Sequence, residues 1–221
     1  MTITKRAGTS VYLVHHGNTL LDEQDKTHGS IDQGLTEKGA RQVRKTAEFL
    51  KQKGVGELYS SPLRRAVETA EIIRKALKIE KPNTVRDGLR PMDTGTLGGM
   101  PNDEIAGVLD DLVARLWARA PGGESVGKFL GRWQGELDRT IHEALEEDHA
   151  CAYVTHSHNL GTLPYVLSSG VAPISLKSGV GPGGVIALHV ADHGGQVVID
   201  EQFDLKPDVI EKWEGRRADD E

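Results

Sequence analysis

The chain has 221 residues, of which 37% are hydrophobic, and it carries a formal net charge of −6 at pH 7. This length suits one domain with a substantial core, and the negative charge, without any basic block, argues against nucleic acid as a general partner. The single cysteine, Cys151, excludes a disulfide within the chain, and no apolar run approaches the roughly 20 residues of a membrane-spanning helix.

Apolar runs and helical periodicities alternate along the chain and predict its elements. In chain order these are strand 11–14, helix 36–50, strand 57–60, helix 62–77, strand 84–86, helices 102–117 and 125–145, strand 151–155, helix 158–167, and strands 185–190 and 196–200. Thr36 opens the first helix, Gly54 follows its end, and Pro62 stands in the first turn of the second. Residues 192–195 carry a hairpin turn signal. The alternation implies a three-layer α/β/α sandwich with a mainly parallel central sheet.

We expect a single domain over residues 1–221, with a cap insertion at about 96–125 covering the site and a frayed, charged tail at 211–221. The aromatic residues of helix 125–145 are assigned to the core. Residues 1–6 lack the apolar stretch of a signal peptide, so we expect a cytoplasmic protein without a membrane partner.

Two predicted strands each end in a histidine. His15 and His16 follow the run 11–14, and His156 follows the run 152–155. Open α/β sheets bind ligands outside the carboxyl ends of their strands. We therefore expect one shared site at these strand ends.

A pair of arginines, Arg64 and Arg65, lies in the first turn of the helix that follows Pro62. Helix N-termini expose unpaired N–H groups, and a guanidinium fork matches phosphate oxygens. The turn that aims Arg65 inward should aim Arg64 toward solvent or the rim of the site. A histidine nucleophile with an arginine clamp indicates phosphoryl transfer.

These motifs resemble those of the histidine phosphatase superfamily, also called the phosphoglycerate mutase-like family, which usually opens with a strand followed by Arg-His-Gly-Glu-Thr. Here that stretch is Leu13-Val14-His15-His16-Gly17-Asn18-Thr19. The resemblance spans roughly residues 9–190 and continues through Asp22, Gly29, Asp32 and the segments 34–39, 61–70, 89–99, 121–125 and 154–157. Six motifs in the family's order make the resemblance specific.

The resemblance implies that His16 becomes phosphorylated, that Arg65 grips the phosphate and that His156 is the other pocket histidine. Further contacts to the phosphate or the bound substrate are implied for Thr19, Asp22 and Gly29. Asp22 stands where the mutases more usually have asparagine, which argues mildly against a mutase.

The same chemistry follows from the residue types. A neutral imidazole nitrogen attacks phosphorus and water later hydrolyses the phosphohistidine, so one hard displacement becomes two easier ones. Arg65 and a charged His156 lower the pKa of His16 by repulsion, and a backbone carbonyl bonded to its other nitrogen fixes the tautomer. The cations also stabilise the equatorial phosphate oxygens. This scheme requires no metal and no cofactor.

The first departure from the family pattern is His15, which replaces a phosphate-binding arginine. Arginine is always charged, whereas histidine is cationic mainly below a pKa of roughly 6.5. Losing one charge-assisted contact is worth about 1.5–3 kcal/mol, or roughly ten- to hundred-fold in binding or rate. We expect a weakened or more acid-dependent pocket.

The second departure is Pro91, in the slot where many members carry the glutamate of Leu-x-Glu as proton donor. Asp93 lies two residues on and would face the same side in an extended segment, displaced by roughly 6.5 Å. Asp93 is therefore the predicted substitute acid. A site without a firm acid should favour leaving groups of low pKa, such as phosphoramidates, anhydrides or activated esters.

The other histidines divide into two groups. His158 is a candidate for the pocket rim, whereas ordinary roles are expected for His28, His142, His149, His189 and His193.

The first functional hypothesis is a metal-independent phosphatase that works through phospho-His16 on a small phosphorylated substrate. A phosphoglycerate mutase-type transferase is the alternative enzyme. A catalytically silent member that binds a phosphorylated ligand is the alternative of another class. Candidate substrates are phosphate esters, nucleotides and protein phosphohistidine, and a homodimer remains open.

Overall fold

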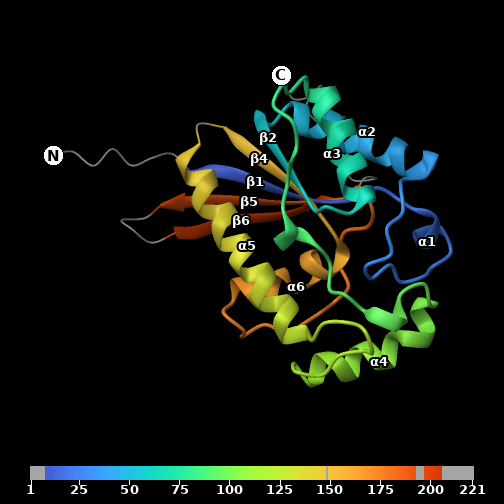
Figure 1. Cartoon of the computed structure of the whole chain (residues 1–221). Helices are drawn as coiled ribbons and strands as arrows, with labels where there is room; N and C mark the ends of the chain where they lie inside the picture. The colour runs from blue at the N-terminus through green and yellow to red at the C-terminus, as the bar shows by residue number, and fades with distance from the viewer. Residues whose placement is uncertain (1–7, 148, 193–196, 206–221) are drawn as a thin grey trace, which may run out of the picture.

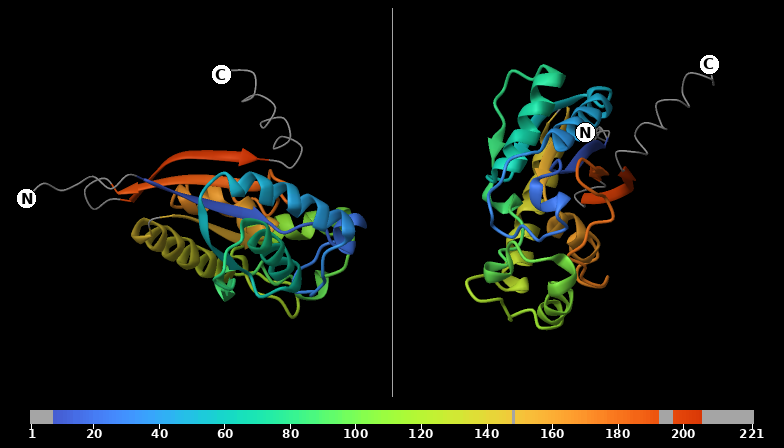
Figure 2. Two further views of the ribbon diagram at one scale, coloured as in Figure 1. Left: turned by 90° about the horizontal axis from the view of Figure 1, so that it is seen from above. Right: turned by 90° about the vertical axis from the view of Figure 1, so that its right-hand side faces the viewer.

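One six-stranded sheet lies between two helical layers in this protein (Figures 1 and 2). The computed structural model describes residues 8–147, 149–192 and 197–205. The strands are β1 (Thr9–His15), β2 (Val55–Ser60), β3 (Thr84–Val85), β4 (Ala150–Thr155), β5 (Val185–Asp192) and β6 (Val197–Leu205). The helices are α1 (Leu20–Glu23), α2 (Glu37–Lys51), α3 (Arg64–Leu77), α4 (Asn102–Ala114), α5 (Val126–Glu146) and α6 (Ser157–Leu167), with 3-10 turns at Asp87–Leu89 and Gly95–Leu97.

The strand order is β3-β2-β4-β1-β5-β6. Strands β3, β2, β4 and β1 are parallel, whereas β5 is antiparallel to β1 and β6 is antiparallel to β5. The predicted three-layer fold with a mainly parallel sheet is confirmed, and the antiparallel hairpin β5-β6 completes one edge.

Successive residues of β1 face opposite layers because strand side chains alternate. Val11 and Leu13 belong to a core formed with α5 and α6, whereas Tyr12 and Val14 belong to a core formed with α2 and α3. Trp133 of α5 is fully buried in the first core. The central strands are thus covered on both faces.

Helices α2 and α5 begin at the predicted capping residues, whereas the first turn of α3 is bonded to a distant loop. Thr36 accepts the Gly39 N–H at 3.1 Å at the start of α2, and Ser125 caps α5. At α3, however, the N-cap residue has no side-chain cap bond, and Asp32 of a distant loop accepts the Arg64 N–H at 2.6 Å. The loop before α2 is therefore tied to the arginine helix.

Some boundaries differ from the prediction. Helix α4 ends at Ala114 instead of 117, because the Leu116 carbonyl accepts the N–H of Gly127 in α5 at 2.7 Å. Strand β6 extends to Leu205 because it pairs with β5 along most of its length. Residues 193–195 of the turn predicted at 192–195, and the tail at 211–221, lie outside the described residues. In the part of the chain that the structure describes, no helix combines the length and apolarity needed to cross a membrane.

The strand register brings three carboxyl ends to one edge of the sheet. His15 of β1 lies opposite Thr155 of β4, and Val154 lies opposite Ser60 of β2. In Figure 1, α4 lies apart from the sheet, beyond the ends of these strands. Residues at these strand ends and residues of α4 line one pocket, which is the candidate active site.

Candidate active site

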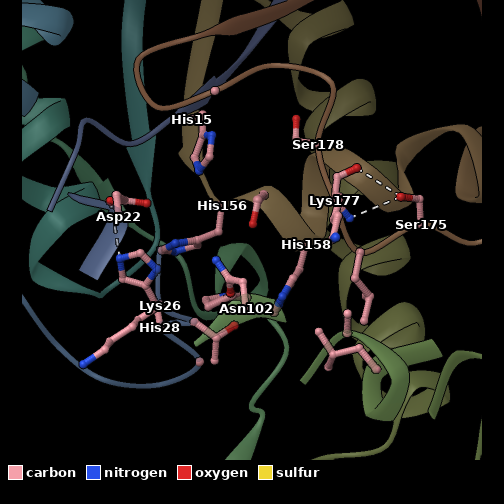
Figure 3. A pocket seen from close by; sticks show the side chains of 18 of the residues that line it. His15, Asp22, Lys26, His28, Asn102, His156, His158, Ser175, Lys177 and Ser178 are labelled. Carbon is pink, nitrogen blue, oxygen red and sulfur yellow. Dashed lines mark hydrogen bonds and ion pairs between the residues drawn. The ribbon is translucent and has the colours of Figure 1, made fainter. Parts of the chain in front are cut away.

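A cavity of about 660 Å³ opens at the carboxyl ends of β1 and β4, and α4 forms one of its walls. Figure 3 shows His15, His28, His156 and His158 placed around this space. The predicted site residues that line it are His15, His16, Asp22, Gly29, Arg65 and His156. Thr19 and Asp93 do not line it.

His16 is held in the tautomer that a nucleophile requires. Its Nδ1 lies 2.9 Å from the Gly17 carbonyl, which can only accept, so Nδ1 carries the proton and Nε2 keeps a lone pair. A Cβ at Gly17 would lie 2.6 Å from the Gly39 carbonyl oxygen, so only glycine fits beside the nucleophile. Burial, followed by the charges of His15 and Arg65, lowers the pKa of His16 well below its usual range. The imidazole is therefore neutral near pH 7.

Arg65 is the buried cation of the site, and its guanidinium is oriented by three bonds. Nε donates to His16 Nε2 at 3.2 Å, Nη1 donates to the Ile31 carbonyl at 2.8 Å, and Nη2 donates to the Gly29 carbonyl at 3.3 Å. Burial lowers the pKa of Arg65 to about 10, against the opposing charges of Asp22 and Asp32. The side chain stays charged at neutral pH, and two of its five N–H groups remain for a ligand.

His156 lies next to His16 in the cavity lining, with ring centroids 5.1 Å apart. Neither ring nitrogen of His156 has a hydrogen-bond partner among the described residues, although the side chain is buried. An unpaired buried polar group is costly unless a ligand satisfies it. Burial and the charge of Arg65 lower the pKa of His156 well below its usual range. This imidazole is available to a bound anion.

His15 occupies the position of the expected arginine and donates from Nδ1 to the Val180 carbonyl at 3.2 Å. Burial lowers its pKa to about 4, against the opposing effects of Asp22 and the Val180 bond. Near pH 7, Nε2 of His15 therefore carries a lone pair. Only protonation turns that atom into a donor for phosphate.

His28 belongs to the site, so the prediction of an ordinary role was wrong. It lines the cavity, its ring lies 5.5 Å from that of His16, and its Nε2 donates to Thr19 Oγ1 at 2.6 Å. The Thr19 hydroxyl donates in turn to Asp22 Oδ2 at 3.0 Å. Burial raises the pKa of Asp22, but the bond with His28 and the charges of His16 and His28 outweigh it and leave the pKa below its usual range. Asp22 is thus an ionised partner of His28.

Thr19 and Gly29 act through other residues. Thr19 is fully buried and caps α1 in a reciprocal bond with Asp22, so its predicted contact with phosphate or substrate finds no support in this geometry. Gly29 lines the cavity at φ +50°, and a Cβ there would lie 2.2 Å from Thr94 Oγ1. Its carbonyl orients Arg65. Glycine is required by both the turn and the close approach.

Asp93 does not face the cavity, and the geometry gives no support to its assignment as general acid. Its Oδ1 accepts the Gly95 N–H at 3.0 Å, in a turn and not in the extended segment that the prediction assumed. Pro91 lines the cavity instead. Arg132 holds this segment through the Pro91 carbonyl and Glu124 Oε1. The slot of the expected acid therefore presents a side chain without a proton to donate.

Two further predictions concern His158, a candidate for the rim of the pocket, and Arg64, expected at the solvent or the rim. His158 lines the cavity with a largely buried side chain. Arg64 is 67% exposed and donates to Glu68 Oε1 at 2.7 Å.

A possible metal-ligand group lies elsewhere among the described residues, at the amino ends of β2 and β4. It consists of Glu57, Glu147 and His149. The carboxylate of Glu57 already accepts from Lys81 and from Tyr59. This group is remote from the strand ends that carry His16 and His156.

Residues 11–199 match the family model of the histidine phosphatase superfamily, branch 1. The chain belongs to this superfamily. Among curated relatives, it is 33% identical over 163 residues to a probable phosphoglycerate mutase, GpmB, from Proteus mirabilis, with 69% of this chain and 72% of the relative covered.

Solved structures share the fold of this chain. The phosphoglycerate mutase of Bacillus anthracis is similar with a TM-score of 0.74 and 22% identity, over 94% of this chain and 97% of that one. A mycobacterial glucosyl-3-phosphoglycerate phosphatase solved with VO3 is similar with a TM-score of 0.72 and 20% identity, over 87% and 98% of the two chains. The two solved structures are named as a mutase and a phosphatase, and the family is named for histidine phosphatases. Phosphoryl transfer or hydrolysis is therefore the supported class of reaction.

Proposed function

We propose that this protein is a metal-independent phosphatase that hydrolyses small phosphate monoesters through a phosphohistidine at His16 Nε2. The observation that carries the proposal is the unprotonated Nε2 of a neutral, buried imidazole, which accepts a hydrogen bond from Arg65 Nε and lies next to the His156 ring. A nucleophile, a fixed cation and an unpaired imidazole thus meet in one cavity.

The reaction proceeds in two displacements. Nε2 of His16 attacks phosphorus, and the bond to the ester oxygen breaks with its electron pair, releasing an alcohol once that oxygen gains a proton. Water then attacks the phosphohistidine, the P–N bond breaks, and its electron pair returns to Nε2. Arg65 stabilises charge on the phosphoryl oxygens in both steps.

Phosphate binding is coupled to proton uptake in this proposal. His15 and His156 are neutral in the free site because burial disfavours their charged forms. A phosphate dianion favours the imidazolium form of each facing ring, since an opposite charge raises the pKa. The pocket therefore gains donors as substrate enters, and activity falls as pH rises.

Mutase activity is the competing hypothesis, and the name of the Proteus mirabilis relative favours it. A mutase returns the phosphoryl group to a bound sugar acid, so it must retain an anionic intermediate. The ionised Asp22 in the cavity disfavours such retention by repulsion.

The test is release of phosphate from para-nitrophenyl phosphate with a chelator present, using the native chain, His16→Ala and the control His142→Ala on the exposed face of α5. We expect turnover in the native chain and the control, none in His16→Ala, and a phosphoryl adduct on the peptide that contains His16. Comparable turnover in His16→Ala would refute the proposal. Interconversion of 2- and 3-phosphoglycerate faster than their hydrolysis would establish a mutase instead.

A further inference from the structure

Neither residue expected to protonate the leaving oxygen of a phosphate ester is placed to do so in the cavity. Pro91 lines the cavity without a proton to give, and Asp93 is bonded in its own turn. An alkoxide is a poor leaving group, so its protonation in the transition state is worth typically 10²–10⁴-fold in rate. Hydrolysis of alkyl phosphates thus depends on another donor in the same cavity.

His158 lies beside this vacant slot. It is the second residue of α6, two positions after His156, and it lines the cavity together with Pro91. Its Nδ1 has no hydrogen-bond partner within the described ranges, and its ring meets Phe129 edge-on at 6.4 Å between centroids. In Figure 3, His156 points to the side of His28, whereas His158 points to the side of Asn102 and the α4 wall. His158 therefore faces the α4 side of the cavity, where a leaving group bound beyond the phosphate would lie.

The other groups of the cavity that could carry a proton are assigned to the phosphate, bonded elsewhere or exposed, and His15 and His156 are the two assigned to the phosphate. His28 and Asp22 are bonded to each other through Thr19. Asp103 and Asp110 of α4 are exposed to solvent. His158 combines burial, an unpaired nitrogen and a place between the phosphate end and the α4 wall.

We propose that His158 is the general acid that protonates the leaving oxygen in the first displacement and the general base that activates water in the second. This inference rests on the proposed phosphatase function. In the first step, the P–O bond breaks as the imidazolium of His158 gives its proton to the departing oxygen, leaving an alcohol and neutral His158. In the second step, neutral His158 takes a proton from the attacking water, the P–N bond breaks toward His16, and phosphate leaves.

The charges around His158 make this step pH-dependent. Burial is the largest cause that lowers the pKa of His158 to about 4, and the charges of His28, Arg65 and His15 lower it further. A hydrogen bond with the backbone of Met92 opposes this shift. The charged groups that also line the cavity are Asp22, Asp25, Lys26, Asp103, Asp110 and Lys177. A bound phosphate dianion raises the pKa of the facing ring. The imidazolium forms in the complex and is lost as pH rises.

The test compares para-nitrophenyl phosphate with propyl phosphate, because the aryl leaving group needs little protonation. In His158→Asn we expect kcat for propyl phosphate to fall by about 10²–10⁴-fold, with less than a fivefold change for the aryl ester and for inhibition by inorganic phosphate. The matched control is His142→Asn, the same replacement on the exposed face of α5. Equal losses on both esters, or no loss on either, would overturn the inference.

A second measurement uses the native chain and needs no variant. We expect the ratio of kcat on propyl phosphate to kcat on the aryl ester to fall between pH 5 and 8.5 as His158 loses its proton. A constant ratio, or aryl hydrolysis without any alkyl hydrolysis at any pH, would overturn the role of His158. Absence of aryl hydrolysis would be a failure of the phosphatase proposal itself, so the two failures are distinct.

Discussion

Replacing His15 with arginine restores a permanent cation at the phosphate end of the cavity. At pH 7, protonating a group with a pKa of about 4 costs about 4 kcal/mol. One charge-assisted hydrogen bond returns only about 1.5–3 kcal/mol. His15 therefore contributes little as a cation near neutral pH, and progressively more as pH falls toward 5.

The magnitude follows from this balance. In His15→Arg we expect kcat/KM on para-nitrophenyl phosphate to rise by about ten- to hundred-fold at pH 7.5. At pH 5, protonation of His15 costs only about 1.4 kcal/mol, so the gain is less than tenfold. The ratio of variant to native activity thus increases with pH.

The assay is kcat/KM from pH 5 to 8.5 for the native chain, His15→Arg and His142→Arg, an equal change on the exposed face of α5. Titration of the ester itself, with a pKa near 6, cancels in the ratio. Calorimetry of inorganic phosphate binding in two buffers counts the protons taken up, and the variant should take up fewer. A ratio that stays constant across this range, or lies below one throughout, would contradict the argument.

Three further outcomes follow. In the folded protein the pKa of His15 and of His158 is lowered to about 4, whereas in the unfolded chain both take up a proton near pH 6.5. Each should therefore lower the free energy of unfolding by up to about 3 kcal/mol as the pH falls from 6.5 to 4. The melting temperature should drop over that window and recover with phosphate, and a flat profile would refute this. Gly29→Ala should destabilise by more than 1 kcal/mol and weaken phosphate inhibition, because its φ is +50° and its carbonyl orients the site arginine. Gly131→Ala in open space on α5 should stabilise by about 0.5–1 kcal/mol in the same denaturation assay, and equal effects of the two changes would count against this account. Pro91→Glu should raise turnover of propyl phosphate at pH 7.5 by about 10²-fold relative to Pro91→Ala, whereas equal rates would show that position 91 does not reach the leaving oxygen.

Local sequence patterns were sufficient for the core of the site. His16 and His156 were expected together because adjacent parallel strands present their carboxyl ends at one edge, and the register of β1 with β4 confirms that geometry. The alternation of strands and helices along the chain likewise predicted the three-layer fold. These features depend on short-range periodicity, which a sequence displays directly.

Other site residues could not be found in this way. His28 lies in a polar loop without periodicity, and only its bond to Thr19 and the capping of α1 bring it to His16. Asp93 was placed by assuming an extended backbone, whereas its carboxylate closes a turn at Gly95. Loop conformation depends on distant contacts that no local pattern encodes.

By itself, the sequence determined the succession of strands and helices along the chain and the kinds of side chain at the strand ends. Both follow from the spacing of apolar residues and from residue identity. The tertiary structure alone decided the protonation of the histidines. The Val180 carbonyl that orients His15 comes from 165 residues away, and the burial that lowers the pKa of His158 depends on packing among separate segments. Desolvation is a property of the assembled neighbours, so it exists only once the chain has folded.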